Sequence, residues 1–176
     1  MAEDRFVLGG VTIELAEDPG VGSGITAWSL PAIDGLGTFT PGAGDALSEH
    51  PNGAVGLDHV VVVTPDFDRT ADALDAADLR LRRVRAAGGF RQGFRRVGPA
   101  ILELVETVGE ARRGRARFWG LVVIVNDIDA LATRLGDLLG TVRPAVQRGR
   151  RIVTLRSQAG LGTKVAFMDA EPPPER

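Results

Sequence analysis

The chain of 176 residues has no cysteine and only two histidines, His50 and His59. Without cysteine it cannot form disulfides, zinc–thiolate sites or a thiol nucleophile. Its net charge is −2, with acidic and basic residues interspersed, which argues against a dedicated nucleic-acid-binding surface. The G-x-S-x-G, Walker A and G-x-G-x-x-G motifs are missing as well. His50 and His59 are therefore the first residues to consider as catalytic or metal-binding groups.

Long apolar runs are also absent, and none approaches the length of a membrane span. The sequence begins MAEDRFVLGG, which is acidic and lacks the apolar core of an export signal. We therefore expect a cytoplasmic protein with neither a membrane nor a nucleic-acid partner. Apolar residues make up 44% of the chain, enough for a sizeable core.

Residues 1–56 differ from the rest and are predicted to form an N-terminal extension. The segment RFVLGGVTIELAE alternates like one strand, and ITAWSL resembles a second, so we expect the two to pair as a β-hairpin. From Pro31 to Gly56 the chain is rich in glycine and proline and is predicted to be a connector. The hairpin should pack on the core because several of its apolar side chains need burial: Phe6, Val7, Val11, Ile13 and Trp28.

From Leu57 onward one pattern occurs twice, which predicts two modules over residues 57–110 and 111–176. LDHVVVV is predicted as a strand, DFDRTADALDAAD as a helix, and LRLRRVR, FRQGFRRVG and AILELVE as three more strands. FWGLVVIV, DIDALATRLGDLL, TVRPAV, RRIVTLRS and TKVAFMD repeat that order. Asp66 aligns with Asp127 and Leu74 with Leu135 at one offset, and QAGLG then lengthens the second copy by two residues. This regularity indicates an internal duplication.

Two tandem βαβββ modules with these helix starts resemble the vicinal oxygen chelate superfamily, which includes glyoxalase-like, bleomycin-resistance-like and extradiol-dioxygenase-like proteins. The most recognisable segments are LDHVVVVTPDFD, AILELVE and LVVIVNDIDALATRL. The resemblance implies an α+β fold, in which the modules form a curved mixed sheet around one cavity with the helices outside. In this superfamily, enzymes hold a divalent metal with one residue from the first strand and one from the last strand of each module.

Carried over to this chain, the first-module metal positions fall on His59 and Glu103. Strand alternation places Leu57, His59, Val61 and Val63 on one face, with Glu103 on the matching face of its own strand and Glu106 on the opposite face. The second-module positions fall on Gly120 and Ala166, which cannot bind a metal. We therefore expect no resident cofactor, because His59 and Glu103 would form only half a metal site.

Without a metal, His59 and Glu103 are expected to form a hydrogen-bonded pair across neighbouring strands, because either group buried alone would be destabilising. Such a pair could serve as acid, base or ligand contact. The strand FRQGFRRVG could turn either face to the cavity, and the second module offers Val153 and Leu155 or Ile152 and Thr154. We predict a largely apolar cavity with one polar wall for a ligand with one polar end. The predicted lining is His59, Glu103, Gln92, Phe94, Arg96, Phe118, Val122, Ile124, Val153, Leu155 and Met168.

Three functions are compatible with this pattern. The first is a glyoxalase-like small-molecule-binding protein that sequesters its ligand and has an incomplete metal site. The second is an enzyme of lyase, isomerase or dioxygenase type that uses His59 and Glu103 as catalytic groups, with or without a weakly held metal. The third is a ligand-free oligomerisation module. The sequence leaves the choice between monomer and homodimer open.

Overall fold

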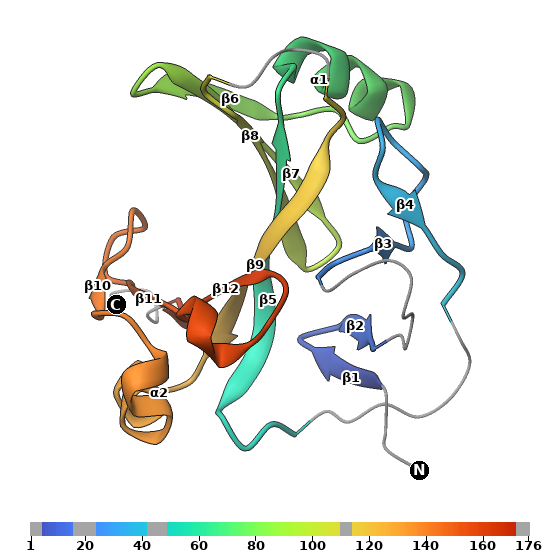
Figure 1. Ribbon diagram of the computed structural model, residues 1–176. Helices are drawn as coiled ribbons and strands as arrows, with labels where there is room; N and C mark the ends of the chain where they lie inside the picture. Colours follow the sequence, from blue (N-terminus) through green and yellow to red (C-terminus); the bar gives the residue numbers. More distant parts are fainter. Residues whose placement is uncertain (1–4, 16–23, 42–48, 110–113, 172–176) are drawn as a thin grey trace, which may run out of the picture.

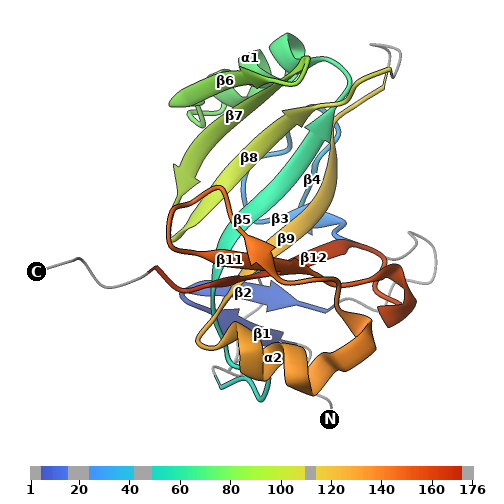
Figure 2. The same cartoon turned by 90° about the vertical axis from the view of Figure 1, so that its left-hand side faces the viewer.

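A computed structural model describes residues 5–15, 24–41, 49–109 and 114–171. Its largest element is one eight-stranded mixed sheet, in the strand order β10-β11-β12-β9-β5-β8-β7-β6. The sheet is strongly curved but does not close into a barrel (Figures 1 and 2). The first module supplies β5 (Ala54–Thr64), α1 (Phe67–Ala76), β6 (Arg83–Ala87), β7 (Phe90–Val97) and β8 (Ala100–Glu106). The second supplies β9 (Arg117–Val125), α2 (Ile128–Leu135), β10 (Arg143–Pro144), β11 (Arg151–Thr154) and β12 (Lys164–Asp169).

The two modules have the same internal register, as expected of a duplication. In the first, β5 runs parallel to β8 with His59 beside Ile101. In the second, β9 runs parallel to β12 with Gly120 beside Lys164. The long strands β5 and β9 are antiparallel to each other and join the modules at the centre of the sheet. The predicted α+β architecture is confirmed.

Both helices begin where the sequence predicts. The side chain of Asp66 accepts a hydrogen bond from Arg69 N at the start of α1, and Asp127 accepts from Asp129 N and Ala130 N at the start of α2. An aspartate at this position satisfies backbone donors that the helix leaves unpaired and places negative charge at the positive end of the helix dipole.

Each helix covers the outer face of its own module. Leu102 and Leu104 of β8 pack with Phe67 and Leu74 beneath α1. In the second module, Val123, Val153 and Phe167 pack with Ile128 and Leu131 beneath α2. The opposite, concave face of the sheet therefore carries the remaining, alternate residues of every strand.

The N-terminal extension does contain a hairpin, but the predicted pairing is wrong. RFVLGGVTIE folds back on itself as β1 (Arg5–Leu8) and β2 (Val11–Glu14), with Gly9 and Gly10 at the turn. Both glycines have positive φ, at 56° and 86°, a conformation that favours glycine in a two-residue hairpin turn. The segment ITAWSL instead contributes β3 (Ala27–Trp28), which pairs in parallel with β4 (Gly37–Thr38).

The extension packs on the core, as predicted. Figure 1 shows β1–β4 on one side of β5 and β9, while β10, β11 and α2 lie on the opposite side. Phe6, Val11 and Ile13 pack against the core beneath α2, and Trp28 is buried in the core beneath α1. Arg69 of α1 also binds Asp34 through Nε–Oδ1 at 3.0 Å. Within the described residues, no helix is long and apolar enough to cross a membrane.

Candidate functional site on the concave face

The strand register brings five of the predicted site residues onto the concave face of the first module. Val61 lies beside Glu103, and His59 lies beside Ile101, so the His59 and Glu103 side chains point to the same side. Strand β7 pairs Phe94 with Glu103 and Arg96 with Ile101. The face of β7 that belongs to the concave side is therefore the one that carries Gln92, Phe94 and Arg96.

A β-bulge adds a residue that sequence alternation does not predict. On β9, Leu57 pairs with Val123 and His59 with Val122, so Asp58 has no partner of its own. Leu57 consequently packs in the core beneath α2, and its predicted place on the face of His59 is wrong. Bulges redirect side chains in this way and are frequent beside functional sites.

The bulged Asp58 lies between Arg150 and His59. Its Oδ1 accepts a hydrogen bond from Arg150 Nη1 at 2.9 Å, and its Oδ2 lies 2.5 Å from Nδ1 of His59. Apart from this short contact, neither Oδ2 nor Nδ1 has a hydrogen-bond partner within the described residues. All three side chains are at most 10% exposed. Burial alone would raise the pKa of Asp58, but the contacts with His59 and Arg150 outweigh it and lower the pKa.

The expected hydrogen bond between His59 and Glu103 is not formed in the described part of the chain. Glu103 Oε1 instead accepts from Gln92 Nε2 at 3.0 Å, and Gln92 Oε1 accepts from Arg85 Nε at 2.9 Å. The prediction failed because Glu103 is level with Val61, one step along the face from His59. The Phe94 ring lies close to His59 and to Arg85. Its centroid is 6.4 Å from the centroid of the His59 ring and 5.1 Å from the Arg85 guanidinium carbon.

Glu103 is held in a setting that disfavours its charge. Burial raises the pKa of its carboxyl group, although the nearby His59 and Arg85 act in the opposite direction. The concave face thus places two titratable groups of different character, His59 and Glu103, beside the same aromatic ring.

The second module provides no counterpart to these groups. Gly120 and Ala166 lie on the concave faces of β9 and β12, where they are paired with Val61 and Val122. A Cβ at Gly120 would collide with the backbone oxygen of Lys164, so this backbone leaves no space for a side chain there. Among the described residues, no three His, Cys, Asp or Glu side chains form a group that could hold a metal ion.

The apolar wall contributed by the second module differs from the predicted one. Val122, Ile124 and Met168 lie on the concave face, with Met168 beside Ile124. Val153 packs beneath α2 instead, so its predicted place in the cavity with His59 is wrong, and the concave alternative on β11 is Ile152, beside Met168.

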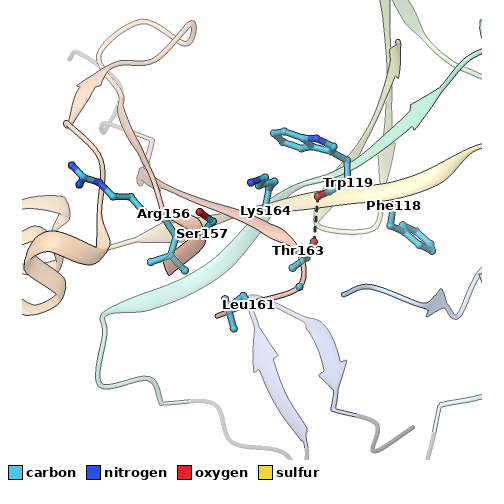
Figure 3. Close-up of a pocket in the computed structure, with 9 residues that line it drawn as sticks. Phe118, Trp119, Arg156, Ser157, Leu161, Thr163 and Lys164 are labelled. Carbon is cyan, nitrogen blue, oxygen red and sulfur yellow. Dashed lines mark hydrogen bonds between the residues drawn. The ribbon is translucent and has the colours of Figure 1, made fainter. Parts of the chain in front are cut away.

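Phe118 and Leu155 also lie away from the concave face. Phe118 packs edge-on against Trp28 at 5.4 Å, because a register shift between Val61 and Val62 turns it to the outer side. Leu155 packs against the core beneath α2. Both residues line a separate hollow of about 260 Å³ (Figure 3). There Phe118 and Trp119 point in different directions, and Thr163 Oγ1 donates to the backbone oxygen of Trp119.

Two further titratable residues are accounted for by structural contacts. Glu106 lies on the other side of β8 from Glu103 and forms an ion pair with Arg91 at 2.9 Å. His50 contacts the N-terminal hairpin, with Nε2 2.7 Å from the backbone oxygen of Val7 and its ring edge-on to Phe6. The second histidine therefore fastens the hairpin to the connector.

The curved sheet, its duplicated register and the outer helices define the two-module vicinal oxygen chelate fold, so the resemblance seen in the sequence is confirmed at the level of the fold. Methylmalonyl-CoA epimerase from Mycobacterium tuberculosis superimposes with a TM-score of 0.55 at 23% identity, covering 70% of this chain and 93% of that one. A Streptomyces coelicolor methylmalonyl-CoA epimerase variant in complex with 2-nitronate-propionyl-CoA gives 0.54 at 19% identity, covering 68% and 99%.

A hypothetical protein from Bacillus halodurans has the same fold, with a TM-score of 0.53 at 18% identity, covering 68% of this chain and 97% of that one. No protein-family model and no curated protein sequence matches the chain. At these identities the solved structures establish the fold alone.

Sequence reasoning missed three residues of the site: Asp58, Arg85 and Arg150. Asp58 directly precedes His59, and simple alternation assigns it to the opposite face. Arg150 lies 92 positions away from Asp58, in the other module. The one available signal was the acidic residue next to a histidine that heads a run of valines.

Proposed function

We propose that the protein binds a small organic molecule on its concave face without a resident metal ion. The observation that carries this proposal is the composition of that face. His59, Glu103 and Gln92 form a polar wall on the first module, and Val122, Ile124 and Met168 form an apolar wall on the second. This division suits a ligand that is largely apolar and has one polar end.

The incomplete metal site favours small-molecule binding over metal-dependent catalysis. The two positions that would complete a four-residue site are Gly120 and Ala166, and Gly120 has no space for any side chain. A cation held by His59 and Glu103 alone would take its other ligands from water or from the bound molecule, which is a weak arrangement. We expect purified protein to contain substoichiometric divalent metal, and a chelator to leave its melting temperature unchanged. Tight, stoichiometric zinc, nickel, manganese or iron by elemental analysis would overturn this.

A thermal-shift screen with apolar acids, ketones and antibiotics tests the binding itself. A ligand that binds only the folded state raises the melting temperature, and the increase grows with the logarithm of the ligand concentration above its dissociation constant. We expect this increase to disappear in both His59→Ala and Glu103→Ala. The matched control is Glu106→Ala, which removes a carboxylate from the same strand but from the opposite face and should retain the increase. If only Glu106→Ala abolished the increase in melting temperature, the ligand would bind on the outer face and the proposal would be wrong.

The contact between Asp58 and His59 favours a second candidate, an enzyme that transfers a proton. A carboxylate next to Nδ1 of a histidine favours the tautomer with a proton on Nδ1, which leaves Nε2 free to accept one. Glu103, whose pKa is raised, would be the second proton-exchanging group on the same face.

The solved structures with this fold include a methylmalonyl-CoA epimerase in complex with methylmalonyl-CoA and NH4+. Methylmalonyl-CoA is therefore the first compound to incubate with this protein in D2O. Incorporation of deuterium next to the thioester carbonyl, abolished by His59→Ala or Glu103→Gln, would establish the enzyme. Ligand binding without such exchange in methylmalonyl-CoA or related thioesters would leave sequestration as the function.

A further inference from the structure

The hollow next to Asp58 contains a buried guanidinium nitrogen without a partner. The hollow has a volume of about 160 Å³ and is lined by Asp58, Arg96, Pro99, Ile101, Ile124, Arg150 and Glu171. The Arg150 side chain is 9% exposed; its Nη1 binds Asp58, and its Nε donates to the backbone oxygen of Asp169 at 2.7 Å. Its Nη2 has no hydrogen-bond partner among the described residues. A buried donor left unpaired destabilises the fold, so an acceptor oxygen at this position would be favourable.

A second guanidinium group lines the same hollow. Arg96 is exposed, and its one hydrogen bond to a described residue is from Nη1 to the backbone oxygen of Pro99 at 3.1 Å. No ion pair joins Arg96 to any carboxylate in the described ranges, so its remaining N–H donors are available to a ligand. Two guanidinium groups with free N–H donors, one from each module, can bind both oxygens of a carboxylate.

The acidic groups at the hollow do not cancel this preference. The two oxygens of Asp58 are already in contact with Arg150 and His59, so its charge is compensated within the protein. Glu171 is exposed to solvent, where its charge is screened. The remaining lining is apolar, with Ile101 and Ile124 facing the hollow. This combination suits a short aliphatic chain that ends in a carboxylate.

The hollow adjoins the proposed binding face. Ile101 is paired with His59 on one side and with Arg96 on the other, so the three residues form one row across β5, β8 and β7. From this arrangement we propose that Arg150 and Arg96 bind the carboxylate of a small aliphatic acid, whose carbon chain then extends along the concave face past His59. This inference rests on the proposed binding function and names its ligand class.

The test compares isobutyrate with isobutyramide, which has nearly the same shape but no charge. Both are titrated through the millimolar range into the full-length protein, and the signals of the arginine Nε–H groups are followed by NMR. We expect isobutyrate to shift the Arg150 and Arg96 signals and to bind at least tenfold more tightly than the amide, since a charged hydrogen bond is worth about a factor of ten or more in affinity. Equal affinity for the acid and the amide, or unshifted arginine signals, would overturn the proposal.

One variant tests the role of Arg96, and a second variant serves as its control. Arg96→Gln should weaken isobutyrate binding about tenfold and leave isobutyramide unaffected, which is the loss expected for one charged hydrogen bond. Arg148→Gln removes an exposed arginine two positions before Arg150 and should change neither. Retained isobutyrate affinity in Arg96→Gln, or an equal loss in Arg148→Gln, would refute the assignment. Because Arg96 is exposed, its replacement should not prevent folding.

The outcomes also separate this inference from the proposed function. If other ligands from the screen bind in a way that depends on His59 and Glu103 while isobutyrate does not bind, the concave face is the site and the carboxylate assignment is wrong. If isobutyrate binding depends on Arg96 but survives both His59→Ala and Glu103→Ala, the carboxylate site exists and the proposed function of the wider face is wrong.

Discussion

The buried pair of Asp58 and Arg150 makes the most demanding prediction about this fold. The two side chains are 10% and 9% exposed, and they connect the two modules across the concave face through a 2.9 Å contact. Removing one member of such a pair leaves the other charge buried, which costs about 3–5 kcal/mol in the free energy of unfolding. We therefore expect Asp58→Leu and Arg150→Leu each to be destabilised by about that amount.

The double variant should be much less destabilised than the sum of the single changes, because no charge is then left buried. A coupling free energy of about 1–3 kcal/mol is expected for groups in direct contact. Urea denaturation of the four proteins measures it, with the exposed pair Arg80–Asp75 as a control cycle that should be close to additive. Strictly additive losses for Asp58 and Arg150 would show that the contact contributes nothing to stability, and the reasoning about this face would fail.

The same pair predicts a pH dependence with a definite sign. The contacts of Asp58 with His59 and Arg150 outweigh the effect of burial and lower its folded pKa below the ordinary value of 3.8. Its contribution to stability is therefore complete above that value and is lost as the pH falls through the folded pKa. The stability gap between the wild type and Asp58→Leu should be largest near neutral pH and should narrow in acid. A gap that widens in acid would contradict this assignment.

Three other substitutions or deletions test separate parts of the structure. Burial raises the pKa of Glu103 in the folded protein, so the neutral carboxyl group contributes stability at low pH, and this contribution is lost as the pH rises through the folded pKa. Glu103→Gln should therefore melt at a higher temperature than wild type at pH 8 but not at pH 4. Gly120→Ala should lower the free energy of unfolding by about 1–3 kcal/mol, because the added Cβ would meet the backbone oxygen of Lys164. Gly53→Ala is the control for backbone strain alone, because Gly53 has a positive φ but open space around its Cβ position. Deleting residues 1–50 should lower the melting temperature markedly, because it removes Trp28, Ile33 and Leu36 from the core beneath α1; an unchanged melting temperature would make the extension an appendage.

The overall fold could be predicted because the signals that specify it are local and occur twice. Asp66 and Asp127 begin equivalent helices, and the register of β5 with β8 is repeated by β9 with β12. Each of these features follows from helix capping or from strand periodicity, which depend on neighbouring residues in the sequence. The hairpin was predicted with the wrong strands because alternation continued through Gly9 and Gly10, whose positive φ values make them the turn.

The site could be predicted only in part, because it depends on departures from regular alternation. Residues on regular stretches of strand, such as Gln92 and Phe94, lie on a face consistent with the sequence pattern. Phe118 follows a register shift, and Asp58 occupies a bulge, so alternation assigns both to the wrong side. A bulge changes the count of residues along one strand without any signature in composition.

The same bulge accounts for the chemistry that distinguishes this concave face. Had β5 been regular, Asp58 would point toward the outer face, and His59 would have no carboxylate within reach of Nδ1. The extra residue turns Asp58 inward, where it meets both His59 and an arginine from the other module. The second module has no side chain at Gly120, so the polar groups are concentrated at one wall and at the row that runs from His59 to Arg96. A ligand on this face is therefore expected to be oriented by its polar end on the first module.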